Sequence, residues 1–177
     1  MKPYIRALWN RIRLRVNGRN CSSCKIEGAQ LFGWDTRLVF GRNSRICLSE
    51  KICSDGRLTI IVGKGAELTI GKRVYFNERM MISCQNRIEI GEGCKFGPNV
   101  TVIDNDHRFA RDGVKGDLTS LPVTIGKNCW IGANAVILNG SVIGDNCVIG
   151  AGCIVKGIIP PASIVTQDRK LNIKPIE

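Results

Sequence analysis

Aromatic side chains are scarce in this sequence of 177 residues, at 6% of the chain, whereas glycine occurs 20 times. A globule built from large interlocking side chains depends on aromatic residues for much of its buried surface. The composition therefore favours a thin, repetitive solenoid over such a globule. The length corresponds to a single domain and is sufficient for a real hydrophobic core.

Long apolar runs are also missing. No apolar stretch reaches the ~18 residues that a membrane-spanning helix requires, and no hydrophobic signal core follows the basic start. Residues 1–26 contain no acidic residue but hold seven of the 26 basic ones. The rest of the chain, with 19 basic and 15 acidic residues, contributes only +4 to the formal net charge of +11. The positive charge is therefore chiefly a property of the N-terminal segment.

A six-residue repeat is the main positive signal. Every sixth residue from position 125 is aliphatic: Ile125, Ile131, Ile137, Ile143, Ile149 and Val155. Glycine follows four of these six, and small residues lie four positions after them. A fixed short period predicts a parallel β-helix in which each coil has three short strands and three turns. The glycines are expected to permit backbone angles that other residues resist, and physics alone would favour right-handed crossovers.

The nine cysteines are odd in number, and several occupy the small positions of the repeat. This pattern predicts reduced thiols packed as small apolar groups, hence a reducing, cytoplasmic location. One C-x-x-C motif, at Cys21 and Cys24, has neither a second pair nor a nearby histidine, so we expect no metal site.

Residues 2–16 predict a short amphipathic helix, because apolar residues recur three or four positions apart. They are Ile5, Leu8, Trp9, Ile12 and Val16. The helix could cover the open edge of the first coil or pack on a neighbouring subunit. Alternatively, the apolar stripe and the arginines beside it could contact anionic lipid at the inner face of the cytoplasmic membrane.

The repeat is loose before residue 70 and is broken completely at residues 104–122. A long polar loop inside a strict repeat is usually functional. The repeat ends near two prolines, which cannot continue a strand ladder. We therefore expect three parts: a basic amphipathic segment at 1–26, a β-helix domain at 27–166 with the loop 104–122, and a polar tail at 167–177.

Residues 131–136, IGANAV, and 143–148, IGDNCV, resemble the repeats of the hexapeptide-repeat acyltransferases. The resemblance covers roughly residues 58–166 and is strongest for sugar O-acetyltransferases of surface polysaccharide and lipopolysaccharide biosynthesis. It implies an all-β, left-handed parallel β-helix that assembles as a homotrimer. It also implies transfer of an acetyl group from acetyl-CoA to a hydroxyl of a saccharide, which could be lipid-linked.

His107 is the only histidine of the chain and lies in the interrupting loop. A hydroxyl acceptor needs a base with a pKa near neutrality, and histidine is the side chain with that range. The resemblance implies that His107 is this general base. Asp104 and Asp106 could orient its imidazole near the acceptor, or could be turn residues that bond their own backbone.

The resemblance also implies acceptor contacts at Asn77, Arg79 and Trp130. Trp130 is too large for a narrow coil, so it should stand outside, either at the acceptor site or at a subunit interface. Arg79 replaces an asparagine that is usual in the family, which indicates a different acceptor, such as an acidic sugar.

For acetyl-CoA, the resemblance implies small residues beside the pantetheine arm at Gly132, Ala133, Ala151 and Gly152. A backbone N–H near Gly132 or Ala133 could also stabilise the oxyanion of the tetrahedral intermediate. Lys156, Arg169 and Lys170 offer positive charge for the phosphates.

Zinc carbonic anhydrases share this fold but need three histidines for each metal ion, which one histidine per chain does not supply. The alternative to O-acetylation is N-acetylation of a nucleotide-linked amino sugar. No recognised nucleic-acid motif accompanies the basic segment, so nucleic acid is not an expected partner.

Overall fold

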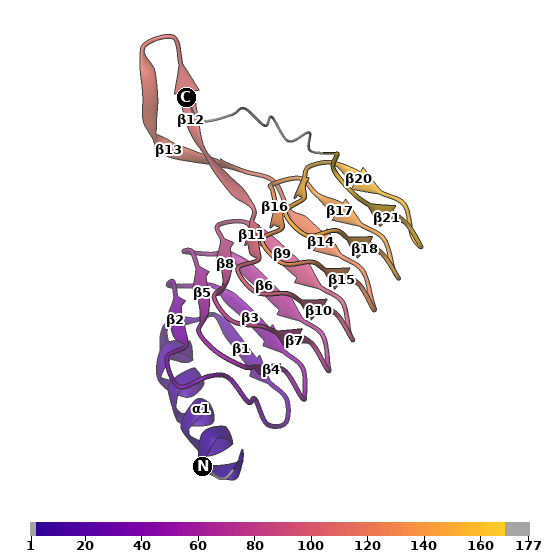
Figure 1. The fold of residues 1–177 in the computed structure, drawn as a ribbon. Helices are drawn as coiled ribbons and strands as arrows, with labels where there is room; N and C mark the ends of the chain where they lie inside the picture. Colours follow the sequence, from indigo (N-terminus) through magenta and orange to yellow (C-terminus); the bar gives the residue numbers. More distant parts are fainter. Residues whose placement is uncertain (1–2, 169–177) are drawn as a thin grey trace, which may run out of the picture.

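Three parallel sheets form the faces of a left-handed β-helix of about six turns (Figure 1). The computed structural model describes residues 3–168. The chain visits faces A, B and C in turn, and each strand pairs with the strand one coil away. This confirms the predicted fold class, and the left hand follows the resemblance, not the general preference for right-handed crossovers.

The strands of the three faces run in register along the solenoid. Face A contains β1 (Ser23–Ile26), β3 (Arg45–Leu48), β6 (Glu67–Ile70), β9 (Arg87–Ile90), β14 (Val123–Ile125), β17 (Val142–Ile143) and β20 (Ile158–Ile159). Face B contains β4 (Cys53–Ser54), β7 (Tyr75–Phe76), β10 (Lys95–Phe96), β15 (Trp130–Ile131), β18 (Val148–Ile149) and β21 (Ile164–Val165). Face C contains β2 (Arg37–Phe40), β5 (Leu58–Val62), β8 (Met80–Cys84), β11 (Thr101–Ile103), β16 (Val136–Ile137) and β19 (Ile154–Val155).

The aliphatic residue of each hexad points into the core, as the repeat predicts. Ile125, Ile131 and Ile137 are at most 1% exposed, and the later members of the series are also buried. The coils that precede the strict hexads continue the same core with larger side chains. Phe76 and Phe96 pack there with ring centroids 5.1 Å apart.

The glycines after the aliphatic residues serve a different purpose from the one expected. Gly126, Gly132 and Gly144 do not have left-handed backbone angles. A Cβ on Gly126 would instead lie 2.6 Å from the carbonyl carbon of Gly144 in the next coil. These glycines are therefore required by the close approach of neighbouring coils. The left-handed angles occur two residues later, for example at Asn128, where φ is 54°.

Buried thiols occupy small positions of the repeat. Cys94, Cys129 and Cys147 lie inside the turns between faces A and B, and each S–H donates to a carbonyl of the following coil at 3.0–3.1 Å. No disulfide is present, since all nine cysteines are free. Each thiol therefore fills interior space and also satisfies a turn carbonyl.

The interruption of the repeat is a β-hairpin, not an irregular loop. Strands β12 (Asn105–Ala110) and β13 (Gly113–Ser120) pair antiparallel, with an irregularity between His107 and Phe109. Figure 1 shows the hairpin projecting away from the solenoid. It leaves the solenoid after β11 of face C and returns at β14 of face A.

The N-terminal helix α1 (Pro3–Asn17) covers the open edge of the first coil, followed by the short 3₁₀ helix η1 (Gly18–Asn20) (Figure 1). Its docking face is largely polar. The buried Asn10 donates from Nδ2 to the carbonyls of Gln30 and Phe32, at 3.3 and 3.0 Å. The first coil has no preceding coil whose amides could bond to its carbonyls. The Asn10 side chain supplies donors for two of these carbonyls.

The β-helix begins before the predicted boundary at residue 27, because β1 at Ser23–Ile26 already pairs with β3. The last residues of the basic segment are therefore part of the solenoid. Within residues 3–168, no helix is both long and apolar enough to span a membrane.

Candidate functional site

Half of the predicted acceptor and cofactor residues form a single column. The turns between faces B and C, which we call corner BC, stack on one another and comprise residues 77–79, 97–99, 132–134 and 150–152. Backbone hydrogen bonds of 2.7–2.9 Å join successive turns, as from the Gly152 amide to the Ala133 carbonyl. Corner BC therefore brings together Asn77, Arg79, Gly132, Ala133, Ala151 and Gly152.

The backbone amide of Gly132 is not a free donor, because it bonds to the Ile149 carbonyl at 2.7 Å. Ala133 differs: its amide makes no hydrogen bond to another residue of the described part of the chain. Pro98 occupies the equivalent position of the preceding turn and has no N–H. The hydrogen bonds between the stacked turns therefore do not use the amide at this position. Of the two amides proposed for the oxyanion, the geometry favours that of Ala133.

Arg79 occupies a strained turn position. Its φ is 56°, in the left-handed region, where the next two turns of corner BC place Asn99 and Asn134. Asparagine tolerates this region well, and most longer side chains do not. Asn99 and Asn134 are joined by a 3.1 Å side-chain hydrogen bond, whereas the Arg79 side chain is exposed.

Trp130 stands outside the coil, as its size predicts, and is 57% exposed. On face B its register partner in the preceding coil is Lys95, and Lys95 in turn pairs with Tyr75. Tyr75 donates its hydroxyl proton to the Asp55 carboxylate, and this bond raises the pKa of Tyr75 to about 12. The sequence analysis did not single out Lys95 or Tyr75. The strand register places Lys95 next to Trp130 and Tyr75 next to Lys95 on face B.

His107 lies in β12, exposed, opposite Leu118 of β13. The neighbouring Asp106 accepts a 3.1 Å hydrogen bond from the His107 backbone amide, which is a local turn interaction. Asp104 is fully buried at the base of the hairpin. Its two carboxylate oxygens accept hydrogen bonds from the amides of Gln85 and Asn86, both at 2.7 Å. In this chain, therefore, the described contacts of Asp104 fix the hairpin base and do not include the imidazole.

Within one chain, the hairpin and corner BC are separated. The hairpin leaves the solenoid at the corner between faces C and A, which we call corner CA, and Lys156 lies at the same corner. Face C lies between the two corners. Arg169 and Lys170, predicted to meet the phosphates, lie outside the described residues. No group of three or more His, Cys, Asp or Glu side chains in residues 3–168 is arranged to hold a metal ion.

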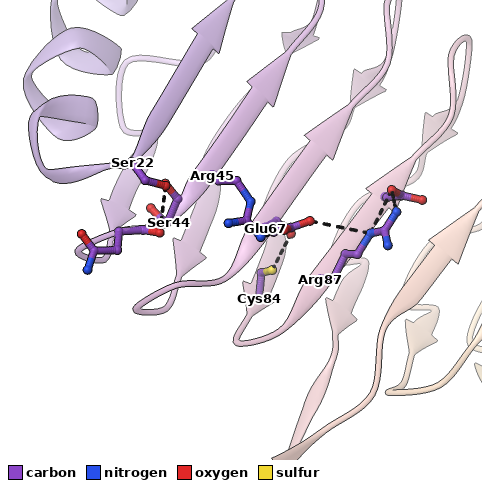
Figure 2. Close-up of polar contacts among 8 residues, drawn as sticks. Ser22, Ser44, Arg45, Glu67, Cys84 and Arg87 are labelled. Atoms are coloured by element: carbon purple, nitrogen blue, oxygen red, sulfur yellow. Dashed lines mark hydrogen bonds and ion pairs between the residues drawn. The ribbon is translucent and has the colours of Figure 1, made fainter.

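The faces differ sharply in charge. Face A carries a row of charged partners, shown in Figure 2, in which Glu67 contacts Arg45 and, at 3.9 Å, Arg87. The strands of face C contain one charged residue, Arg37 in the first coil; their other outward side chains are apolar or small and polar. Exposed ion pairs contribute little to stability, but a charged face is costly to bury. Burying face C against another subunit would therefore cost less than burying face A.

Comparison with known proteins agrees with the fold and the repeat. Residues 122–157 match the family described as bacterial transferase hexapeptide (six repeats). Galactoside O-acetyltransferase of Escherichia coli (strain K12) is 42% identical over 98 residues, covering 55% of this chain and 48% of that protein. Nodulation protein L of Rhizobium meliloti (strain 1021) is 41% identical over 102 residues, covering 57% and 56%.

The chain thus spans about half the length of the curated relatives it matches. An N-acyltransferase from Bacillus cereus, solved with dTDP and coenzyme A, has a TM-score of 0.64 at 15% identity. That match covers 92% of this chain and 88% of the other, and it shows the shared fold. Together the matches confirm the resemblance to hexapeptide-repeat acyltransferases.

Proposed function

We propose that this hexapeptide-repeat protein is an acetyl-CoA-dependent O-acetyltransferase that acts on a saccharide hydroxyl, with His107 as the general base. The observation that carries the proposal is the position of two features on either side of face C. The hairpin with His107 rises from corner CA, and the column with the predicted cofactor and acceptor residues forms corner BC.

A homotrimer packed through face C would bring these features together. Three parallel prisms around a threefold axis place corner CA of one subunit beside corner BC of the next. The hairpin is long enough to reach outward and carries exposed apolar residues, including Phe109 and Val114, for contact with a neighbour. Each of three grooves would then contain His107 from one subunit and the column from another.

The chemistry follows from these groups. His107 takes the proton of the acceptor hydroxyl as the oxygen attacks the thioester carbonyl of acetyl-CoA. The Ala133 amide is a donor suited to the negative charge that develops on the carbonyl oxygen. The C–S bond then breaks, the acetyl group remains on the acceptor oxygen, and the imidazolium returns its proton to the CoA thiolate.

Small turn residues support a site for the pantetheine arm. Ala133, Ala151 and Gly152 leave corner BC without large side chains beside the exposed turns, and Lys156 at corner CA offers a charge for a phosphate. An N-acyltransferase that shares this fold was solved with coenzyme A. Acetyl-CoA is therefore proposed as the co-substrate, and no step needs a metal.

On the acceptor side, Trp130 offers an aromatic surface for a sugar ring, and Arg79, Asn77 and Lys95 offer polar contacts. The similarity to a galactoside O-acetyltransferase favours a hydroxyl over an amine. We propose a role in surface polysaccharide or lipopolysaccharide biosynthesis at the cytoplasmic side. N-acetylation of a nucleotide-linked amino sugar is the competing activity, and release of CoA with amine but not hydroxyl acceptors would favour it.

The test is a mixed-trimer experiment with two inactive variants. His107→Ala should lower kcat by about 10²–10⁴, the usual effect of losing a general base, with acetyl-CoA binding retained. Ala151→Trp should block the pantetheine path at an exposed turn without disturbing the core. Equal mixtures assembled together should recover activity in about a quarter of the grooves, because each groove draws on two subunits. No recovery, or near-normal kcat in His107→Ala, would contradict the proposal.

A further inference from the structure

The apolar stripe of α1 is exposed after the helix has docked. Ile5, Leu8 and Ile12 are 46%, 61% and 48% exposed, and Trp9 and Val16 are similarly open. The residues that α1 buries are Asn10 and Leu14. The helix therefore already covers the first coil without the five apolar residues that make it amphipathic.

The stripe points directly away from the solenoid. With roughly 100° between successive residues, Ile5 and Ile12 lie about 140–180° around the helix from Asn10 and Leu14. Because Asn10 bonds to the edge carbonyls of the first coil, the opposite face looks outward along the solenoid axis. Trp34 of the first coil stacks beside Trp9, with ring centroids 6.4 Å apart, and enlarges the apolar surface.

Cationic side chains border this surface on both sides. On the helical wheel, the exposed Arg11 and Arg15 lie on one side of the stripe. Arg6 and Arg13 lie on the other side and are half-buried, and Arg13 donates to the Trp34 carbonyl at 3.3 Å. Residues 1–26 contain no acidic residue, so a second copy of α1 would bring arginine against arginine. Charge complementarity therefore favours an anionic partner.

A groove beside the stripe also suits an anionic head group. It lies between α1 and the first coil, has a volume of about 510 Å³, and is lined in part by Leu8, Arg11, Arg15 and Ile26. Its lining residues include these two arginines and no acid. Apolar and cationic groups thus meet at one place next to the exposed stripe.

We propose that α1 lies on an anionic phospholipid bilayer, with the stripe among the acyl chains and the arginines at the phosphates. The docked polar face fixes α1 across the end of the solenoid, so the solenoid axis points away from the membrane. In the trimer packed through face C, three stripes would lie in one plane and bind the same bilayer together. This docking is independent of the proposed chemistry and is tested without an activity assay.

The experiment is co-sedimentation of the full chain with vesicles of phosphatidylcholine alone or mixed with phosphatidylglycerol. We expect binding only to the mixed vesicles, and weaker binding as salt rises, because screening shortens the range of the attraction. Ile5→Ser with Ile12→Ser should reduce this binding at least about tenfold and leave the melting temperature unchanged. Ile158→Ser with Ile164→Ser is the matched control, since these isoleucines are also exposed but lie at the other end of the solenoid.

A second comparison tests the role of charge with two double variants. One combines Arg11→Gln and Arg15→Gln, and its control combines Arg42→Gln and Arg57→Gln. Both pairs remove the same charge from exposed positions, and only the first pair should weaken binding to the mixed vesicles. Absence of vesicle binding by the full chain, or full binding by the Ile5/Ile12 variant, would overturn the proposal. A change of oligomeric state in that variant by light scattering would show that the stripe packs on a second copy, which would also overturn it.

Discussion

Replacing Asp104 by asparagine should separate the structural role of this carboxylate from catalysis. The side chain is fully buried, and its oxygens accept hydrogen bonds from the amides of Gln85 and Asn86 at 2.7 Å each. A third hydrogen bond, from Asn105 Nδ2, reaches the same carboxylate at 3.1 Å. In Asp104→Asn one oxygen becomes an NH₂ group, which faces a backbone donor and cannot accept its proton.

Hydrogen bonds to a charged group contribute about 1.5–3 kcal/mol each, and a buried donor left unpaired costs about 1–3 kcal/mol. We therefore expect Asp104→Asn to destabilise the protein by about 2–3 kcal/mol. For a chain of this size that corresponds to a decrease of roughly 4–12 °C in the melting temperature. Thermal unfolding followed by circular dichroism measures this shift.

Asp106→Asn is the matched control, because it makes the same change two residues away at an exposed side chain. Its carboxylate accepts a hydrogen bond from the amide of His107 at the surface, so the melting temperature should change by less than about 2 °C. Equal melting temperatures for Asp104→Asn and the unmodified protein would refute the assignment. If Asp104 instead orients the imidazole, Asp104→Asn would lower kcat while leaving the melting temperature unchanged.

Two further predictions concern the solenoid itself. Gly126→Ala should destabilise the protein by about 2 kcal/mol or more in thermal unfolding, because the new Cβ would lie 2.6 Å from the backbone of the next coil; Gly116→Ala, with nothing within 4 Å, should have little effect, and equal losses would contradict the close-approach argument. Thiol titration of the native protein should label at most the four half-buried cysteines, and the five buried ones only after unfolding. Burial and the nearby Asp104 raise the pKa of the Cys84 thiol, and burial raises that of Cys24 to about 11, so these two thiols are scarcely ionised near neutral pH. Rapid labelling of all nine would contradict the buried thiol positions.

The sequence predicts the later coils well and the earlier ones poorly, for a geometric reason. Between β14 and β17, Thr124 pairs with Val142, so one coil takes 18 residues, or three hexads. Between β3 and β6, Arg45 pairs with Glu67, so one coil takes 22 residues. The early strands of faces A and C have four or five residues each. A count in sixes therefore loses register there, although the same three faces and the same core continue.

The helix shows a different limit of sequence reasoning. Its apolar periodicity predicts an amphipathic helix, and a helix is found at Pro3–Asn17. The usual rule that the apolar face packs inward fails, because the surface it covers is the open edge of a coil. That edge presents backbone carbonyls, and a buried carbonyl without a donor is costly. Asn10 supplies such donors and is buried in place of the isoleucines.

The same reasoning explains why the candidate site could be predicted only in part. The spacing of the hexads places Gly132, Ala133, Ala151 and Gly152 on one corner, because equivalent positions of successive coils must stack. His107 belongs to a hairpin whose base is held by the buried Asp104 and by contacts of Asn105 with Ser83, and no periodicity encodes these contacts. Corner BC and the hairpin lie on either side of face C, so the site that we propose needs a second subunit. The repeat thus accounts for the corner BC half of the proposed groove, whereas the half with His107 depends on the trimer packing that we propose.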